Sequence, residues 1–375
     1  QRWPEALADL GKAIELNPHL PQAWLNLSNL HWLTGRLQAA RQALDQAIHL
    51  RPNYPKALYN RGMLQMLHGD FDQGWLGYAY RFQAIPNLLP SISLPPCSAG
   101  GDASKPLLLV QEQGLGDVFQ FVRYAALAKP LCSQLILAVE PKLVSLLSQA
   151  NLADAVLPFP LAEDQVPPEC SWMPLLSLAA WLGVSRTSPQ WVVPYLPLDH
   201  RRYSAWRQTL PAKSGRGLRL GVHWQGNPAH EEGVSRGRSL PLELLRPLAE
   251  IEGLELVSLQ KGPGCEQLAQ CSFREHFNPA QHKVDQAWDF AETAAIAACC
   301  DVVLTNDTAL AHLCGGLGLP VWILLKAIPE WRWGLEGCST SWYPSARLFR
   351  QERTDDWTGV ITAVVKALRH LEPLR

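Results

Sequence analysis

The chain opens with a stretch in which apolar residues recur every three or four positions, the spacing of amphipathic helices. This spacing predicts one helix over about 3–16 and a pair of helices in each of the segments 20–51 and 54–85. From about residue 106 the pattern changes to short apolar runs separated by helical spacing, which is typical of buried parallel strands joined by helices. An all-helical region followed by an α/β region is therefore expected.

The α/β region divides into two halves. Strands are predicted over 107–110, 133–140 and 153–159 in the first half, and over 218–224, 254–262, 301–307 and 319–325 in the second. Strands that alternate with helices predict a doubly wound parallel sheet in each half. A long amphipathic helix is predicted in the tail, over 355–374.

The helical region contains an internal repeat. Pro18 recurs as Pro52 and Gly35 as Gly69, each at an offset of 34 residues. Within one unit the pattern consists of Trp24, Leu25, Leu27, Gly35, Ala43, Ala47 and Pro52. This pattern resembles the tetratricopeptide repeat, whose arrays usually bind peptide or protein. A structural cap on an enzyme is the alternative role. Because the array is so short, it is expected to pack against the next domain or to continue upstream.

Composition excludes several classes of function. The formal net charge is -1, without a block of like charges, so nucleic acid and anionic membranes are not expected as partners. No apolar run is long enough for a transmembrane helix, and no signal peptide is visible. The nine cysteines form no Cys-x-x-Cys pair, which favours free thiols in a reducing compartment and a cytoplasmic location over a disulfide framework or a zinc site.

The most informative loop of the second half joins the strand 301–307 to the following helix. Asp307, Thr308 and Ala309 lie at this junction, where the free N–H groups of a helix start suit a diphosphate. His312 lies one turn further along the same helix face. A helix cap with a buried core histidine is the alternative. A zinc site lacks further ligands at suitable spacing, and a catalytic triad lacks its nucleophile turn. Gly315, Gly316 and Gly318 are interpreted as close packing and termination of the helix.

Two further loops carry candidate chemistry. In the first half, Gly114 and Gly116 indicate a tight turn and precede Asp117 at a helix start. The helix dipole is expected to lower the pKa of Asp117 and to keep a carboxylate ready to accept a proton, with a plain helix cap as the alternative. The polar loop after the strand 218–224 contains four candidates for ligand contacts, the alternative being a solvated loop: Gln225, Asn227, Arg236 and Arg238.

These segments resemble a known family. "GLGDVFQFVRY", "GVHWQGNPAH" and "DVVLTNDTALAHLCGGLGLPVWILL" look like bacterial tetratricopeptide proteins that carry a module similar to the ADP-heptose:lipopolysaccharide heptosyltransferases. The module is more distantly similar to the O-linked N-acetylglucosamine transferases. The resemblance implies the GT-B fold, with two Rossmann-like parallel-sheet domains, a cleft between them and a C-terminal helix that returns to the first domain.

This resemblance also implies roles for single residues. Asp117 becomes the candidate base, while Asp307, Thr308, Ala309 and His312 hold a nucleotide-diphosphate sugar as co-substrate. Arg236 or Arg238 takes the place of a cationic pair of the family. Gln260 and Lys261, which end a predicted strand, are expected to touch the base or ribose. No metal or other cofactor is implied, and no Asp-x-Asp sequence occurs in either α/β half.

The predicted organisation comprises a repeat region over 1–86, a linker over 87–105, Rossmann-like domains over 106–206 and 207–350, and a helix within 351–375 that packs on the first domain. The predicted function is an inverting, metal-independent glycosyltransferase. Its acceptor is a protein or peptide recruited by the repeats, or a glycan or lipid. A catalytically inactive scaffold and a nucleotide-sugar epimerase are the alternatives.

Overall fold

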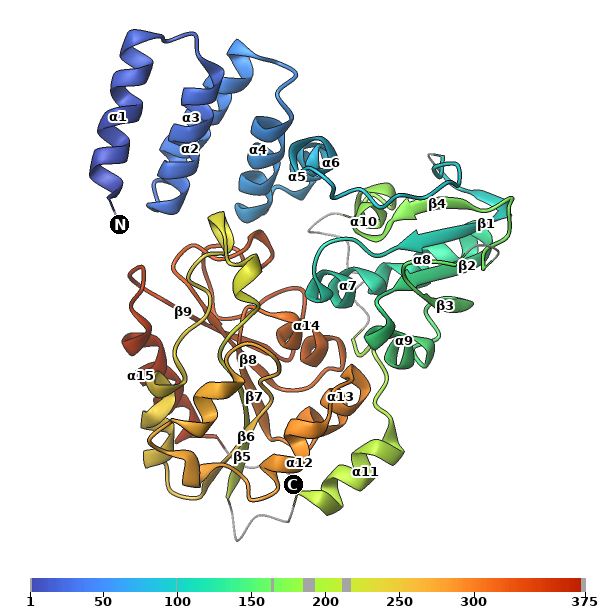
Figure 1. Cartoon of the computed structure of the whole chain (residues 1–375), viewed down its shortest axis with the longest axis vertical. Coiled ribbons are helices and arrows are strands. Elements are labelled where there is room, and N and C mark those ends of the chain that lie inside the picture. The colour runs from blue at the N-terminus through green and yellow to red at the C-terminus, as the bar shows by residue number, and fades with distance from the viewer. Residues whose placement is uncertain (1, 99, 163–164, 185–192, 211–216, 372–375) are drawn as a thin grey trace.

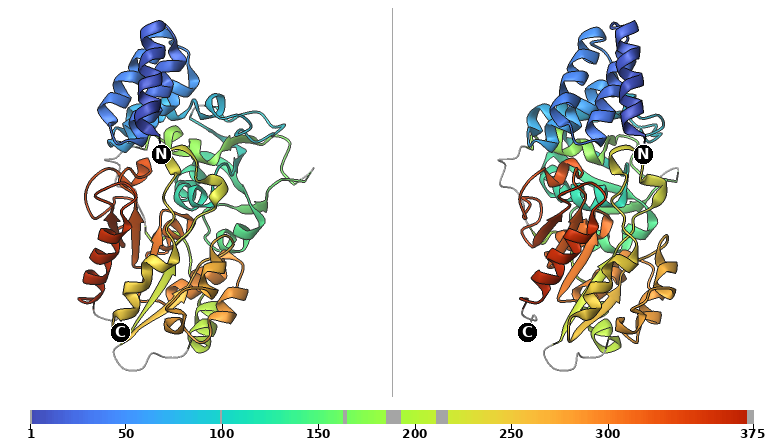
Figure 2. Two further views of the ribbon diagram at one scale, coloured as in Figure 1. Left: turned by 60° about the vertical axis from the view of Figure 1, so that its left-hand side comes forward. Right: turned by 90° about the vertical axis from the view of Figure 1, so that its left-hand side faces the viewer.

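The computed structural model describes residues 2–98, 100–162, 165–184, 193–210 and 217–371. Helical repeats stand at one end of the molecule, above two α/β domains that lie side by side (Figure 1). The two rotated views in Figure 2 show the same three parts. The predicted fold class, helical repeats followed by two Rossmann-like parallel-sheet domains as in a GT-B protein, is confirmed.

The repeat region forms the helices that the periodicity predicts. They are α1 (Trp3–Leu16), α2 (Pro21–Leu33), α3 (Leu37–Leu50), α4 (Pro55–Leu67), α5 (Phe71–Tyr78) and the short α6 (Arg81–Ala84). Pro21 and Pro55 occupy the first positions of α2 and α4, where the fixed φ of proline favours a helix and its missing N–H has no helical partner to lose. Ala40, Ala43 and Ala47 are buried on α3, so small side chains allow close packing in the array.

The first sheet has four parallel strands in the order β3-β2-β1-β4. These are β1 (Asp102–Val110), β2 (Cys132–Val139), β3 (Ala155–Pro158) and β4 (Ser171–Pro174), with α7 (Leu115–Phe121), α8 (Ala125–Ala128), α9 (Pro141–Ser148) and α10 (Leu178–Trp181) between or after them. Strand β1 begins inside the predicted linker, and the short β4 was not predicted. Ile92 and Leu94 of the linker pack against a buried cluster of this sheet, so the segment partly covers one face.

The second sheet has five parallel strands in the order β6-β5-β7-β8-β9. These are β5 (Leu218–His223), β6 (Leu254–Ser258), β7 (Val302–Asn306), β8 (Val321–Leu325) and β9 (Ala346–Arg350), with α12 (Gln281–Gln286), α13 (Phe290–Ala298) and α14 (Ala309–Gly316) among them. The helix predicted after β5 is a 3₁₀ helix, η6 (Leu242–Glu250), which contains Pro247. Proline lacks the N–H that an α-helix would need at this position.

The predicted docking of the C-terminal helix is wrong. Helix α15 (Trp357–Leu368) packs on the second domain, with Val360 and Val364 in a buried cluster that also holds Val222 of β5 and Trp322 of β8. Figure 1 shows α15 beside β9, on the side of the second sheet away from the first domain. A short loop joins α15 to β9, the strand that the sequence analysis did not predict, and returns the helix to its own sheet.

The boundary predicted between residues 206 and 207 is also displaced. Helix α11 (His200–Thr209) packs against α13 of the second domain. The Arg202 Nη1 donates to Glu292 Oε1 at 2.5 Å, and the Trp206 indole donates to the same carboxylate. The whole of α11 therefore belongs with the second domain, because its polar side chains find their partners there.

One aromatic cluster joins all three parts of the molecule. Trp331, in the 3₁₀ helix η9 (Trp331–Trp333) of the second domain, packs edge-on against Trp75 of the repeats at 5.6 Å between ring centroids. It also contacts Phe121 of α7 at 6.4 Å and Phe71 of α5 at 5.9 Å. Aromatic pairs of this geometry add to the burial of their area, so the repeats are held firmly over the two α/β domains.

Candidate functional site

The first-domain loop places Asp117 at the interface with the second domain. Its Oδ2 accepts from the Gly114 N–H at 3.0 Å, which caps helix α7. Its Oδ1 accepts from Arg332 Nη2 of the second domain at 2.6 Å. Arg332 also donates through Nε to Gln120 Oε1 at 2.7 Å. Asp117 is therefore a helix cap and an interdomain ion pair at once.

The pKa of Asp117 moves in the direction opposite to the one predicted from the helix dipole. Burial raises the pKa of this carboxyl above its ordinary value, against the opposing effects of the Arg332 guanidinium and the Gly114 N–H. Loss of water around the carboxylate outweighs the dipole here. A carboxylate with a raised pKa is a stronger proton acceptor than an exposed aspartate.

The second-domain loop begins helix α14 with Thr308 at its cap position. The Thr308 side chain makes no capping hydrogen bond. Its Oγ1 lies 3.2 Å from Thr305 Oγ1 and 3.5 Å from His223 Nδ1. Ala309 is the first residue of the helix, where backbone N–H groups lack intrahelical acceptors. The hydroxyl and these amides are therefore not consumed by capping.

His312 lies at the contact between α14 and α7 rather than on an open surface. Its Nδ1 is 2.8 Å from the Tyr343 hydroxyl, and its ring stacks on Trp333 at 5.2 Å. Burial lowers its pKa well below the ordinary value, and the charge of Arg332 adds to this effect. His312 is thus neutral at neutral pH, and one ring nitrogen is committed to tyrosine.

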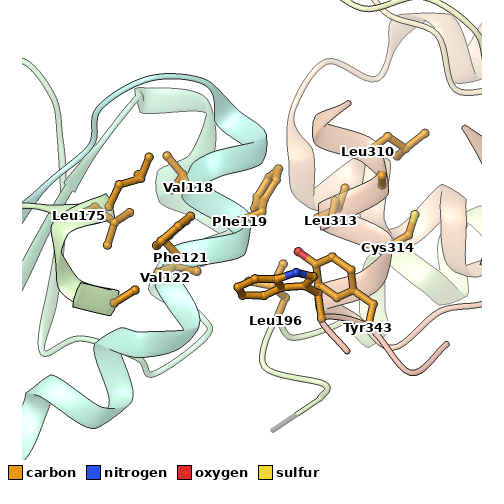
Figure 3. Packing of buried hydrophobic residues seen from close by; sticks show 14 of the residues in the cluster. Val118, Phe119, Phe121, Val122, Leu175, Leu196, Leu310, Leu313, Cys314 and Tyr343 are labelled. Carbon is orange, nitrogen blue, oxygen red and sulfur yellow. The ribbon is translucent and has the colours of Figure 1, made fainter. Parts of the chain in front are cut away.

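The two candidate loops touch each other through Gly116. A Cβ at this position would lie 2.9 Å from His312 Cδ2 and 3.4 Å from Ala309 Cα, so any side chain would push the two helices apart. Figure 3 shows the adjoining apolar contact, where Phe119 of α7 points toward Leu310 and Leu313 of α14. The glycine that resembled part of a ligand loop is required for the close approach of the two domains.

The glycines at the end of α14 have separate roles. A Cβ on Gly315 would lie 2.4 Å from the Tyr343 ring, and one on Gly316 would lie 2.7 Å from Leu196 Cδ1. Only Gly318 adopts the left-handed conformation, with φ of +72°, that ends helices. Gly318 therefore ends helix α14, whereas Gly315 and Gly316 leave room for the side chains of Tyr343 and Leu196.

His223, which the sequence analysis did not select, stands at the carboxyl end of β5. Its Nδ1 is 3.0 Å from Asn306 Oδ1 at the end of β7. The Asn306 amide donates to the Arg238 carbonyl at 3.1 Å, so its oxygen faces His223 and accepts from Nδ1–H. Burial lowers the pKa of His223 to about 4, helped by the Arg238 charge. The neutral ring keeps its Nε2 lone pair as an acceptor.

The two candidate arginines are in different places. Arg238 lies near Gly226 and 3.6 Å from Glu231, and its Nε is buried without a hydrogen-bond partner in the described part of the chain. Its charge acts on Asp307 and His312. Arg236 is exposed and lines a pocket against the repeats. Arg238 therefore belongs to the site, whereas Arg236 faces another part of the molecule.

Asp307, which precedes Thr308 in the loop between β7 and α14, is buried. Only 7% of it is exposed, and burial raises the pKa of its carboxyl, with Arg332 opposing the rise. The Arg332 guanidinium thus acts electrostatically on two carboxylates, Asp117 of the first domain and Asp307 of the second. The region combines two helix N-termini with Arg332 and Arg238, whose charges are paired with the carboxylates of Asp117, Glu330 and Glu231.

Gln260 is used by the backbone of its own domain. Its Oε1 accepts from the Trp224 and Gln225 N–H groups, and its Nε2 donates to the Gln225 and Pro263 carbonyls. All four hydrogen-bonding positions are occupied, so Gln260 has no unpaired amide group to offer a base or ribose in this structure, and the contact stays a prediction. Its role is to fix the loop after β5.

Three other predicted contacts are also engaged locally. Gln225 Oε1 accepts from Gln267 Nε2 at 2.8 Å. The exposed Asn227 caps a short helix by accepting from the Ala229 N–H. Lys261 donates to the Val284 carbonyl. None of these contacts places the side chain beside Thr308 or Asp117.

The repeats reach the carboxyl edge of the first sheet. Arg81 of α6 forms a two-point ion pair with Glu112, at 2.9 and 2.6 Å, and also donates to Ser177. Glu112 is the second residue after β1 and further accepts from the Leu176 N–H. Gln113 donates to the Tyr78 hydroxyl at 2.8 Å. The repeats therefore cover the edge at which the first sheet could bind a ligand.

Arg332 and His223 are the functional candidates that the sequence analysis missed. Arg332 stands between two tryptophans in "WRWG", and a lone cation among large aromatics indicates burial with a partner. His223 ends the strand β5 beside β7, where the strand order of the second sheet reverses. Both signals were present in the sequence, but only the strand order explains why His223 faces a site.

The remaining candidate chemistry is dispersed. An Asp-x-Asp sequence occurs in the repeats, where Asp70 caps α5 by accepting from the Gln73 N–H. Within the described ranges, no group of three or more His, Cys, Asp or Glu residues is placed to hold a metal ion. The nine cysteines are free thiols. Among the described helices, none has the length and apolar character needed to cross a bilayer.

Sequence comparison supports the repeat region. Residues 1–57 match the family model described as Tetratricopeptide repeat, which confirms the predicted repeats there. The chain is 26% identical over 338 residues to Protein FlbA of Caulobacter vibrioides, in an alignment covering 82% of this chain and 54% of that protein. The chain thus spans about half the length of this curated relative.

Solved structures that are similar to this one include three glycosyltransferases. The glycosyl transferase family 9 protein from Veillonella parvula has a TM-score of 0.47 at 11% identity, covering 73% of this chain and 92% of that one. The E. coli ADP-heptose lps heptosyltransferase II has a TM-score of 0.46 at 14% identity, covering 70% and 97%. A Thermobaculum terrenum O-GlcNAc transferase mutant has a TM-score of 0.27 at 12% identity, covering 98% and 92%.

Proposed function

We propose that the chain is an inverting, metal-independent glycosyltransferase that uses a nucleotide-diphosphate sugar. The observation that carries the proposal is the contact between the starts of α7 and α14, which brings Asp117 of one domain and Thr308 of the other to the same interdomain region. Each helix follows the carboxyl end of a parallel strand, the usual place for ligands in such sheets.

Different groups of the site suit the sugar donor and the acceptor substrate. The Thr308 hydroxyl, the first amides of α14 and the Arg238 guanidinium are hydrogen-bond donors that suit the diphosphate of the sugar donor. His223 Nε2 suits a hydroxyl of the nucleotide or sugar. In the proposed reaction the acceptor oxygen attacks the anomeric carbon, the bond from that carbon to the diphosphate breaks, and Asp117 takes the acceptor proton. In-line attack inverts the anomeric centre.

Arg332 links the two halves of this reaction. In the free protein it neutralises Asp117 at 2.6 Å. We propose that the diphosphate of the donor competes for Arg332 and draws it away from Asp117. The carboxylate then loses its cation in a buried place, which increases its basicity at the moment when a proton must be accepted. The leaving diphosphate would be neutralised by arginines and helix dipoles without a metal ion.

The repeats are proposed to recruit the acceptor. Helix α4 packs against η9, which carries Arg332, and burial raises the pKa of Tyr59 of α4 with the carboxylates of Glu330 and Asp117 adding to the rise. A polypeptide bound to the repeats beside α4 would therefore lie near the proposed base. A glycan or lipid acceptor would show no dependence on the repeat surface.

The test is a thermal-shift screen of the full chain against nucleoside diphosphates and sugar nucleotides. A specific ligand at about one hundred times its dissociation constant should stabilise the protein by about 2.7 kcal/mol. Turnover of the stabilising donor should persist in EDTA, and loss of activity with chelator would overturn the metal-independent part. Product formation should require an acceptor, because an epimerase would convert the donor alone.

An inactive scaffold is the second candidate, favoured by one observation. Both oxygens of Asp117 are already bonded, to Arg332 and to Gly114. A scaffold would keep this ion pair as a permanent latch between domains. In that case no nucleotide in the screen would stabilise the protein, and replacing Arg332 would cost stability without affecting any ligand.

A further inference from the structure

The turn between β1 and α7 is strained at one residue. Gln113 has a φ of +59°, in the left-handed region that residues with a Cβ rarely adopt. Gly114, which could adopt this conformation without steric cost, follows it with an ordinary φ of -86°. The strained position is therefore not the glycine, and contacts from outside the turn must hold Gln113 in place.

The repeats supply these contacts. Gln113 Nε2 donates to the Tyr78 hydroxyl of α5 at 2.8 Å. Tyr78 is itself buried, and the guanidinium carbon of Arg81 lies 4.7 Å from the centre of its ring. Arg81 in turn pairs with Glu112. A buried tyrosine therefore holds the strained glutamine, and the neighbouring ion pair holds the residue before it.

This turn supplies one of the two hydrogen bonds of Asp117. The Gly114 N–H donates to Asp117 Oδ2 at 3.0 Å, and because the peptide group is planar, its direction is set by the backbone of the preceding residue. The other bond comes from Arg332 at 2.6 Å. The Tyr78 ring packs edge-on against the adjacent Trp331, at 6.4 Å between ring centroids. Tyr78 thus contacts both segments that bind the Asp117 carboxylate.

We propose that Tyr78 is a positioning residue for Asp117, acting through the strained turn at Gln113. Without the Tyr78 hydroxyl, the turn relaxes toward a negative φ and the Gly114 N–H leaves the carboxylate. The repeats then contribute to the geometry of the proposed base in addition to recruiting an acceptor. The effect on turnover rests on the proposed transferase function, whereas the hydrogen bond and the ionisation of the carboxyl can be measured without any substrate.

The decisive comparison is between Gln113→Ala and Gln113→Gly, which both remove the amide from Tyr78 and leave the buried core intact. Alanine keeps the strain and loses the bond that holds it, so the Gly114 N–H should exchange with solvent about tenfold faster than in the parent chain. Glycine removes the strain together with the bond, so the exchange rate should stay near that of the parent. NMR of the full chain with isotopically labelled glycine measures this rate. Equal protection in Gln113→Ala and the parent would overturn the proposal.

Tyr78→Phe approaches the same contact from the repeats. It should expose the Gly114 N–H to exchange as Gln113→Ala does, and Gln113→Gly introduced into Tyr78→Phe should restore the protection. Tyr80→Phe, at a half-buried tyrosine two residues further along, is the matched control and should exchange as the parent does. A loss of protection in Tyr78→Phe that glycine does not restore would show that Tyr78 only fills the core.

Titration of the Asp117 carboxyl by NMR gives a second readout. The Gly114 N–H favours the charged carboxylate, so its loss in Gln113→Ala should raise the pKa of Asp117 further, while Gln113→Gly should leave the pKa unchanged. Arg332 and Glu330, whose charges also act on this carboxyl, are the same in both variants.

Turnover separates this inference from the proposed function. In a transferase, kcat should fall in Gln113→Ala and be kept in Gln113→Gly, with donor affinity unchanged in both. A raised pKa of Asp117 in a protein that turns over no sugar nucleotide would support the positioning role against the transferase proposal. Normal turnover with an unshifted pKa in Gln113→Ala would do the reverse.

Discussion

The carboxyl edges of the two parallel sheets are used in different ways. At the first sheet, Glu112 follows β1 and is bound by Arg81 of the repeats in an ion pair whose side chains are 0% and 2% exposed. At the second sheet, His223, Thr308 and Arg238 lie at the ends of β5 and β7 or in the loops that follow them. The Thr308 hydroxyl contacts only neighbouring groups of these segments, and Arg238 Nε makes no hydrogen bond to any described residue.

The difference shows that one topology can serve assembly at one edge and ligand binding at the other. A buried charge is costly unless it is paired and hydrogen-bonded, and Glu112 meets this requirement fully with Arg81 and Leu176. The Arg238 Nε is paired with Glu231 at 3.6 Å but makes no hydrogen bond to any described residue. We therefore interpret the first edge as a joint with the repeats and the second edge as the place for an anionic ligand.

The largest effect is expected from Asp117→Asn. This variant tests whether the first domain contributes a catalytic residue or only contacts that hold the parts of the molecule together. If Asp117 accepts the proton, transfer should fall by about two to four orders of magnitude. Nucleotide affinity should be kept or rise, because Arg332 no longer has to leave a carboxylate to contact the diphosphate. Steady-state turnover and calorimetric titration measure the two quantities. Asp102→Asn, at the exposed opposite end of β1, is the control. Normal turnover in Asp117→Asn would remove this residue from the mechanism.

The next largest effect concerns the joint itself. Arg81→Met leaves Glu112 buried without its cation, which should lower the free energy of unfolding by about 3 to 5 kcal/mol. Urea unfolding measures this change. The control is Arg61→Met, because Arg61 pairs with Asp45 at 3.8 Å on the surface and should contribute less than about 1 kcal/mol. A loss in Arg81→Met as small as that of the control would show that the edge is not a joint.

Thr308→Val tests whether the second edge binds a phosphate. The variant should weaken nucleoside-diphosphate binding by about tenfold to a hundredfold, the range for a hydrogen bond to a charged group. Stability should change little, because the Thr308 hydroxyl does not cap α14. Calorimetry measures the affinity, and Thr308→Ser should bind like the parent. A loss of stability without a loss of affinity would return Thr308 to the role of a helix cap.

The smallest effect is a pH dependence at the same edge. Burial lowers the pKa of His223 to about 4, whereas an unfolded chain has a histidine pKa near ~6.5. As the pH falls from about 6.5 to 4, the unfolded state takes up a proton that the folded state does not, so the free energy of unfolding decreases. Partial exposure limits this contribution to roughly 2 kcal/mol.

His223→Gln isolates the effect of pH on this one group. The variant should lose less stability than the parent chain over the same interval, and the difference between the two unfolding curves measures the contribution of His223. His312 has a lowered pKa as well and is present in both proteins, so its effect cancels in the difference. Parallel curves for the two proteins would show that His223 titrates as it does in water.

Most of the fold could be predicted from the sequence because periodicity and turn residues act locally. The repeat helices, three strands of the first sheet and four of the second lie where the apolar spacing indicates them. Strand β4 escaped prediction because it is short, and β9 because Arg347 and Arg350 interrupt its apolar run. Without β9 there was no local reason to place α15 on its own sheet.

The candidate site was predicted only as a set of positions. Asp117, Thr308 and His312 do lie at helix starts or on the first turns that follow them, since a cap residue after a buried strand is a local signal. Their partners were not predictable in this way. Arg332 lies 215 residues from Asp117 in sequence, and the Gln260 amide meets backbone groups whose positions depend on the path of a whole loop.

The sequence by itself determined which segments form helices and strands, that the chain begins with a 34-residue repeat, and which polar residues stand at strand ends. These properties depend on neighbours a few residues away. Only the tertiary structure decided which partners the polar groups have: Glu112 pairs with Arg81 of the repeats, and Asp117 pairs with Arg332. It also decided that α15 packs on the second sheet. Burial and pairing of charges depend on how separate domains dock, and no local pattern encodes that.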